Sequence, residues 1–362
     1  MRRSPKTSCS ALHCEVIAIP TMPQLLAQRP KMRYIFTGGK GGVGKTVAAA
    51  GLAYHYASQG ERVLLASLNP VHSLSSLFGQ SLSGGKVVEV QGAKGVHAVE
   101  VETTEVVERY RNSIRGRVKE FLKWADIPLD AKPFIEITTT NPAFEESAMF
   151  DRMVDYILKE GEAFDRVIFD TAAVANAVRL IGLSKIYGLW LTRMIDSRKE
   201  ALSMRVQLSF RKEKVMEEVK KDPLMADLIS MNERFEQAKG VLVDPERTAF
   251  FFVTLPLALP IAVVRRFIGM VQKFNIPIGG VIVNEVLRPE IALQEGAGEY
   301  LGNKYHEQTG YMKVLYRDLG PLVRSYIPLY ASEVGGVDMI RRVSEDMMSY
   351  APPFAAELSG GA

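Results

Sequence analysis

A glycine-rich segment carries the most specific chemistry in the sequence. Residues 38–46 read GGKGGVGKT, and from Gly39 they fit the spacing G-x-x-x-x-G-K-T that cradles nucleotide phosphates. Glycines let backbone N–H groups turn toward a phosphate, Lys45 can reach the β and γ oxygens, and the Thr46 hydroxyl can ligate Mg²⁺. The pattern predicts a nucleotide site formed by Gly39, Lys40, Gly41, Gly42, Val43, Gly44, Lys45, Thr46 and Val47.

Two polar residues that close apolar runs can complete this site. Asp170 ends the run 167–169, where a carboxylate can hold Mg²⁺ through water, although an aspartate there can also simply cap a turn. Asn284 follows the run 279–283 and can offer its amide to an adenine edge, or act only as a turn former. Thr46 and Asp170 are therefore the predicted metal ligands.

The elements that must position these residues alternate between short apolar runs and helical stretches, as is typical of a parallel sheet covered by helices. The runs are nearly free of charge, which suits strands buried on both faces; they cover residues 34–37, 63–68, 96–101, 167–169, 249–255, 279–283 and 326–329. We predict an α/β P-loop NTPase fold, with a mostly parallel sheet flanked by helices and an inserted helical subdomain. The helix after the glycine-rich loop is expected over residues 45–58.

Two stretches interrupt this alternation. Residues 103–124 have apolar positions spaced by three and four, and residues 197–240 form a charged, methionine-containing helical region divided at Pro223. We predict a helical subdomain over 103–162 and 197–247, inserted into a nucleotide-binding core over 32–102, 163–196 and 248–350. Residues 1–31 are expected to form a disordered tail, and 351–362 a second tail. The subdomain's methionines either line an exposed client groove or pack in its core; they are Met204, Met216, Met225 and Met231.

Composition excludes several classes of protein. The 362 residues include 45 basic and 41 acidic side chains, a balance that predicts no nucleic-acid partner. The only cysteines are Cys9 and Cys14, so a cysteine-based metal site in the body is excluded and a reducing, cytoplasmic location is expected. The most apolar stretch, 249–264, is shorter than the ~20 residues of a spanning helix and contains two prolines, so no integral membrane segment is expected.

Lys40 has no role in an ordinary P-loop, and with it the loop resembles the deviant Walker A motif of the class that includes the arsenical pump-driving (ArsA) and tail-anchored-protein-targeting ATPases. Residues 68–74 resemble that family's switch I, 169–172 its switch II, 283–284 its adenine-reading V-N, and 328–336 its late P-L…E-V-x-G. These matches follow the family's order from about residue 32 to 348. The resemblance implies a homodimer with Mg²⁺ and ATP or ADP, in which Lys40 contacts phosphates across a two-fold interface, Asn284 contacts adenine and Pro328 belongs to the nucleotide-binding residues. It also implies a hydrophobic helical client, such as a tail-anchored protein.

The sequence departs from the family pattern at positions that bear on catalysis. Asn69 stands where the family has the aspartate that orients and deprotonates water, and an amide cannot accept that proton. Loss of a general base costs ~10²–10⁴-fold, so we expect slow hydrolysis with Lys40, Lys45 and Asn69 as the catalytic residues. Residues 173–176 also differ from switch II. The family's C-x-x-C is missing from residues 285–310, so no zinc is expected, and metalloid activation is not expected either.

Two functions remain open on these residues. One is an ATP-dependent dimeric switch, in which slow hydrolysis changes the shape of the helical subdomain. The other is an ATP-binding scaffold or regulator with little or no hydrolysis, which Asn69 and the altered switch II favour. Both predict ATP binding, so phosphate release rather than binding distinguishes them.

Overall fold

The computed structural model describes residues 20–69, 73–124, 142–171, 223–296 and 298–352, with scattered residues between 189 and 207. The sequence features at His72, at residues 173–176 and at Met216 lie outside this part of the chain. Within it, no helix is both long and apolar enough to cross a membrane.

The described chain forms one eight-stranded sheet in the order β3-β4-β2-β5-β1-β6-β7-β8. Only β3 pairs antiparallel with its neighbour; the other strands are parallel, which confirms the predicted α/β fold class. The strands are β1 (Tyr34–Gly39), β2 (Val63–Ser67), β3 (Val88–Glu89), β4 (Val96–Glu100), β5 (Arg166–Asp170), β6 (Thr248–Thr254), β7 (Ile278–Val286) and β8 (Val323–Pro328).

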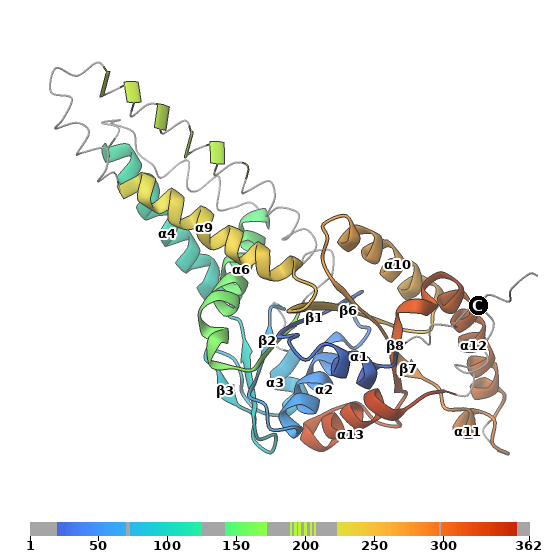
Figure 1. Ribbon diagram of the computed structural model, residues 1–362. Helices are drawn as coiled ribbons and strands as arrows, with labels where there is room; N and C mark the ends of the chain where they lie inside the picture. The colour runs from blue at the N-terminus through green and yellow to red at the C-terminus, as the bar shows by residue number, and fades with distance from the viewer. Residues whose placement is uncertain are drawn as a thin grey trace, which may run out of the picture.

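Helices cover both faces of the sheet (Figure 1). On one face lie α1 (Met22–Gln28), α2 (Lys45–Ser58), α3 (Ser73–Phe78) and α13 (Gly336–Ser349). On the other lie α10 (Ala258–Gln272) and α12 (Glu299–Leu319), joined by parts of α4 (Thr103–Trp124), α6 (Pro142–Leu158) and α9 (Pro223–Val243). Shorter turns of helix connect elements: η1 (Glu160–Ala163), α11 (Pro289–Ala292) and η2 (Gly320–Leu322).

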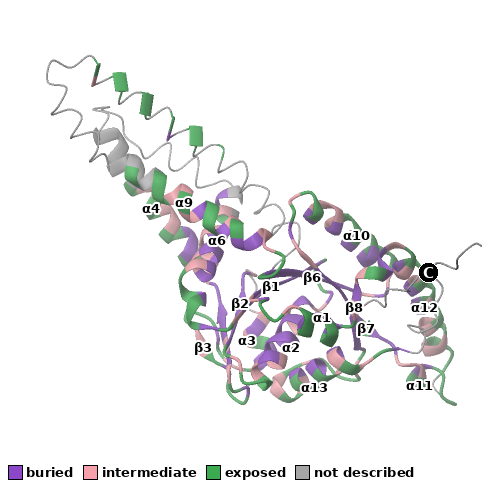
Figure 2. Ribbon diagram, viewed as in Figure 1, coloured by how far each residue is buried: buried purple, intermediate pink, exposed green. Residues whose placement is uncertain are grey.

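Apart from the two-residue β3, the strands are largely buried on both faces, as the nearly charge-free runs predict, and Figure 2 shows the central strands in the buried colour. Alternate side chains of each strand enter opposite cores because successive Cβ atoms point to opposite faces. In β1, Phe36 faces the α10 side and Ile35 the α2 side. Phe36 stacks between Phe169 and Phe250, with ring centroids 4.7 Å and 5.2 Å apart, so aromatic packing holds the three central strands together.

Helices α4, α6 and α9 pack on one another and extend away from the sheet (Figure 1). The rings of Tyr110 and Phe144 join α4 to α6, and those of Phe150 and Phe235 join α6 to α9. Arg234 of α9 adds charged contacts to α6, described below. These helices supply the physical basis for the predicted helical subdomain, whose boundaries stay a prediction.

The methionines of this region do not share one environment. Met204 is exposed, whereas Met231 is half-buried. The side chains of Met216 and Met225 are not among those that the structure describes. The choice between an exposed groove and core packing therefore stays open.

Two helices have the predicted bounds, whereas the predicted disorder of the N-terminal region is wrong for residues 22–28. Helices α2 and α4 cover residues 45–58 and 103–124 as expected. Residues 22–28, which we predicted to belong to a disordered tail, form α1 with Met22, Leu25 and Leu26 buried. The Gln24 side chain accepts a hydrogen bond from the Thr21 N–H at 2.9 Å, so this short helix has a capped start and an apolar face.

Candidate functional site

The glycine-rich loop connects β1 to α2 at the carboxyl edge of the sheet, between β5 and β6. Gly39 lies so close to the Val253 carbonyl of β6 that a Cβ atom could not fit. Gly42 and Gly44 have φ values of 76° and 88°, a left-handed conformation that glycine adopts at little cost. Gly39, Gly42 and Gly44 are thus required by the backbone of the loop itself.

Asn284, a residue of β7, contacts the glycine-rich loop. Its Nδ2 donates to the Val43 carbonyl at 3.0 Å, and the side chain is buried. A Cβ atom on Gly44 would collide with the same Nδ2. Asn284 therefore anchors the loop backbone, a contact that the sequence did not indicate, while its role toward adenine stays a prediction.

Lys45 and Lys40 occupy opposite environments on the loop. Lys45 is buried at the start of α2, and its Nζ donates to the Lys40 carbonyl at 3.2 Å. Burial lowers the pKa of Lys45, and the nearby Asp170 carboxylate opposes that shift. Lys40 itself is exposed, so it lies on the outside of the loop.

The two predicted metal ligands lie in contact. Thr46 Oγ1 donates to Asp170 Oδ2 at 2.7 Å, at the place where β5 pairs with β1. Asp170 is completely buried; burial raises its pKa to about 6, against the Thr46 hydrogen bond and the charge of Lys45. Its other oxygen, Oδ1, is buried without a hydrogen-bond partner among the described residues. A carboxylate oxygen left free beside a hydroxyl has the chemistry that Mg²⁺ requires.

Among the residues that the structure describes, no group of three or more His, Cys, Asp or Glu side chains is arranged to hold a metal ion. A magnesium ion bound with phosphate needs only one or two protein oxygens, so the Thr46–Asp170 pair is sufficient. The expectation that the protein binds no zinc stays a prediction.

Asn69 follows β2 on the segment that passes the loop. The residue is half-buried, and its backbone N–H donates to Ser67 Oγ at 3.4 Å. Helix α3 begins soon afterwards at Ser73, whose Oγ lies 3.4 Å from Thr46 Oγ1. Asn69 is therefore attached to a short element that contacts the P-loop threonine.

Glu100 is a buried carboxylate that the sequence reading missed. It ends β4 and accepts the backbone N–H groups of Leu74 and Ser75 at 2.6 Å and 3.0 Å, and the Ser75 hydroxyl at 2.6 Å. The available signal was a glutamate near the end of the mostly apolar run 96–101. That position fits a carboxylate that satisfies the start of a helix.

A hydrogen bond connects the ends of β7 and β8, close to the residues that are predicted to bind the nucleotide. Pro328 is buried at the end of β8, and the Leu329 N–H donates to the Val286 carbonyl at 2.9 Å. Arg288 and Tyr330, one after each strand, both donate to Asp346 of α13, at 3.2 Å and 2.7 Å. Asn284 and Pro328 thus lie on adjoining strands at the same edge as the P-loop.

Comparison with known proteins agrees with this geometry. The model of the anion-transporting ATPase family (ArsA ATPases) matches residues 32–349. The chain is 27% identical to ATPase GET3B of Arabidopsis thaliana, covering 86% of this chain and 77% of that relative. It is 29% identical to ATPase GET3C of the same plant, covering 85% and 80%, and 25% identical to the putative arsenical pump-driving ATPase 2 of Aquifex aeolicus, covering 87% and 98%. The chain therefore belongs to the anion-transporting ATPase (ArsA) family.

Proposed function

We propose that this protein is an ATP-dependent molecular switch that binds Mg-ATP at the P-loop and hydrolyses it slowly. The family match and the ATPase names of the relatives support ATP hydrolysis in general. The single observation that carries the proposal is the contact between Thr46 and the buried Asp170, whose Oδ1 has no hydrogen-bond partner in the described chain. A buried, partly unsatisfied carboxylate costs stability unless the site uses it.

The loop residues have separable roles in this proposal. Backbone N–H groups of residues 41–46 and the start of α2 face the phosphates, where the helix dipole favours negative charge. Lys45 neutralises the β and γ oxygens, and Thr46 and Asp170 would hold Mg²⁺. The bound ion supplies positive charge to the phosphate oxygens.

Asn69 sets the rate. Its amide can orient a water molecule but cannot take the proton from it, and phosphoryl transfer depends mainly on positioning and charge stabilisation. Hydrolysis at a reduced rate follows from this chemistry. We further propose a homodimer in which Lys40, exposed on the loop, reaches the phosphates bound by the second copy.

The helical region of α4, α6 and α9 is the proposed client-binding part, with a hydrophobic helix such as a tail anchor as its occupant. Its connection to the site is direct, because α9 leads into β6 and β6 pairs with β1 beside Gly39. A change at the loop can therefore reach these helices through one strand.

The alternative function is an ATP-binding scaffold or regulator with little or no hydrolysis. Asn69 favours this alternative, since the residue lacks a group that accepts a proton. Under this function ATP would stabilise one shape of the protein without being consumed.

Phosphate release tests the proposal. We expect the purified protein to release phosphate from Mg-ATP at a low rate that depends on Mg²⁺. The variant Lys45→Ala serves as the blank, because it removes the buried cation that faces the phosphates. A wild-type rate equal to that of Lys45→Ala, with ATP still bound, would contradict hydrolysis and support the scaffold.

A further inference from the structure

The buried carboxylate of Glu100 connects a strand of the sheet to the segment that carries Asn69. Glu100 is 1% exposed and directs both carboxylate oxygens at α3. Oε1 accepts the N–H groups of Leu74 and Ser75, and Oε2 accepts the Ser75 hydroxyl. Three hydrogen bonds to one carboxylate make this contact specific in position as well as favourable.

The sheet places Glu100 in line with the phosphate site. In the strand register Glu100 lies beside Ser67 of β2, and Ser67 lies beside Asp170 of β5. Ser67 Oγ accepts the backbone N–H of Asn69 at 3.4 Å. The start of α3 is therefore between two fixed points, Glu100 on one side and Thr46 on the other, where Thr46 Oγ1 lies 3.4 Å from Ser73 Oγ.

Helix α3 is too short to keep its position without contacts to the rest of the protein. It has only 6 residues, and isolated helices shorter than ~12 residues are marginal in water. Its apolar residues Leu74, Leu77 and Phe78 anchor it to the core, but apolar packing is not directional. The hydrogen bonds that Glu100 accepts fix the backbone of Leu74 and Ser75 in the first turn of the helix.

We propose that Glu100 is a positioning residue for catalysis: by holding the first turn of α3, it sets the location of Asn69 relative to the phosphates. This inference rests on the proposed function for hydrolysis, although the contact itself does not. The hydrogen bonds described for Glu100 go to α3 and not to the P-loop, so we expect its effect on the rate of the chemical step and not on ATP affinity.

The test is a pair of substitutions with separate readouts of rate and affinity. Glu100→Ala removes all three hydrogen bonds, and we expect kcat for phosphate release to fall about tenfold with KM for ATP unchanged. Glu100→Gln keeps an amide oxygen for the two N–H groups and an amide N–H for Ser75 Oγ. We expect Glu100→Gln to restore most of the rate. Hydrogen exchange at residues 74–78 should become faster in Glu100→Ala and stay slow in Glu100→Gln.

Glu102→Ala is the matched control. Glu102 lies two residues further along the chain and accepts the N–H of Gly84, a residue beyond α3, at 3.2 Å. We expect this variant to keep the wild-type kcat. If Glu100→Ala does not fold, Ser75→Ala is the smaller change: it removes the hydroxyl that donates to Oε2, and with it the acceptor of the Leu82 N–H.

Several outcomes would overturn the proposal. An unchanged kcat in Glu100→Ala, or a tenfold loss that Glu102→Ala shares, would show that Glu100 has no specific effect on the rate. An unchanged kcat with a raised KM would assign Glu100 to binding instead. If the wild type itself does not exceed the Lys45→Ala blank, the proposed hydrolysis fails; exchange at residues 74–78 with ATP bound then decides alone whether Glu100 positions α3.

Discussion

The site contains one side chain that is unfavourable without a ligand. Asp170 is a completely buried carboxylate with one oxygen unpartnered among the described residues, and burial raises its pKa to about 6. Such local costs concentrate where a ligand repays them.

Asp170→Asn tests the metal-binding role. The amide keeps the size and a hydrogen bond to Thr46 but removes the charge that Mg²⁺ requires. We expect Mg²⁺ to lose its effect on ATP affinity and phosphate release to fall by at least ~10²-fold. We also expect the nucleotide-free variant to unfold at a temperature a few degrees higher, because a buried charge has been removed. Retained Mg²⁺-dependent binding, measured by titration calorimetry, would exclude Asp170 as a ligand.

Gly44→Ala tests the contact between the loop and Asn284. Gly44 has φ 88°, and a Cβ atom there would collide with Asn284 Nδ2. We expect the variant to lose ~1–3 kcal/mol of unfolding free energy in urea. Gly41→Ala is the control, since a Cβ at Gly41 meets no atom within 4 Å and its φ is not positive. Equal losses in the two variants would contradict the described loop geometry.

The sequence could predict that Thr46 of the glycine-rich loop and Asp170 lie together, because a local pattern and the end of a strand indicate them; their role as metal ligands stays a prediction. The contacts of Glu100 with α3 and of Asn284 with Val43 could not be predicted. Each joins segments that are distant in sequence, 241 positions apart for Asn284 and Val43. Such contacts depend on strand order and register, which periodicity in a single sequence does not contain.

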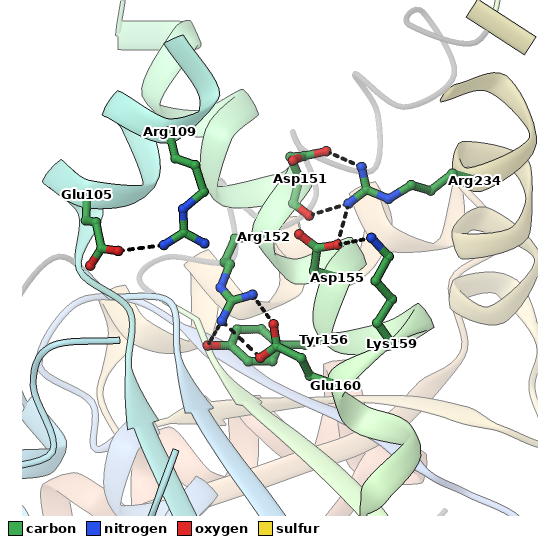
Figure 3. Close-up of polar contacts among 9 residues, drawn as sticks. All are labelled: Glu105, Arg109, Asp151, Arg152, Asp155, Tyr156, Lys159, Glu160 and Arg234. Carbon is green, nitrogen blue, oxygen red and sulfur yellow. Dashed lines mark hydrogen bonds and ion pairs between the residues drawn. The ribbon is translucent and has the colours of Figure 1, made fainter. Parts of the chain in front are cut away.

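At the level of elements, a group of ion pairs connects the helices that leave the core (Figure 3). Arg234 of α9 donates to Asp151 Oδ1 at 2.7 Å and contacts Asp155 of α6 at 3.0 Å. Lys159 contacts the same Asp155 at 3.4 Å, so α6 carries the acidic side of the group. Because α9 continues toward β6, this group is a candidate path between these helices, the proposed client-binding part, and the P-loop.

Arg234→Gln tests that connection. We expect faster hydrogen exchange along α6 and α9 and a loss of ~0.5–1.5 kcal/mol in unfolding free energy, since these pairs are only partly exposed. The control is Arg109→Gln, whose exposed pair with Glu105 lies within α4 at 2.6 Å. That variant should lose less than ~0.5 kcal/mol. Unchanged exchange in Arg234→Gln would remove these pairs from the connection.

Long amphipathic or alanine-rich helices were the most predictable elements. Helices α2 and α4 have the predicted bounds because their periodicity and end signals agree. Strand β3 was missed since two residues carry no pattern. Helix α1 was predicted as a tail because seven residues have too few turns for a periodic signal, yet Arg29 beyond its end donates to the Thr248 carbonyl at 2.6 Å and fixes it to β6.

At the scale of the whole molecule, the central sheet explains why the site is formed by residues from many segments of the chain. The P-loop, Asn69, Glu100, Asp170, Asn284 and Pro328 all lie at or after the carboxyl ends of parallel strands, which meet at one edge. The alternation of runs and helices predicted this class of fold. The order of the strands was not predictable, because runs of similar composition can pair in many ways.

Lys40→Ala tests the proposed homodimer. Lys40 is exposed on the loop, and a charge supplied from a second copy accounts for its position. We expect ATP-dependent dimers in sedimentation velocity to be lost and phosphate release to fall at least ~10-fold. Lys94→Ala is the control, because Lys94 is exposed just before β4, at the opposite edge of the sheet. A Lys40→Ala variant that still dimerises with ATP and keeps its rate would contradict a role across the interface.

The most direct measurement is phosphate release from Mg-ATP by the wild type, Asn69→Asp and Lys45→Ala, compared at equal protein concentration. A restored general base should accelerate hydrolysis by ~10²–10⁴-fold. We expect the wild type to exceed the Lys45→Ala blank and Asn69→Asp to be faster still. A wild type equal to the blank, beside an active Asn69→Asp, would contradict it and identify a scaffold that binds ATP without consuming it.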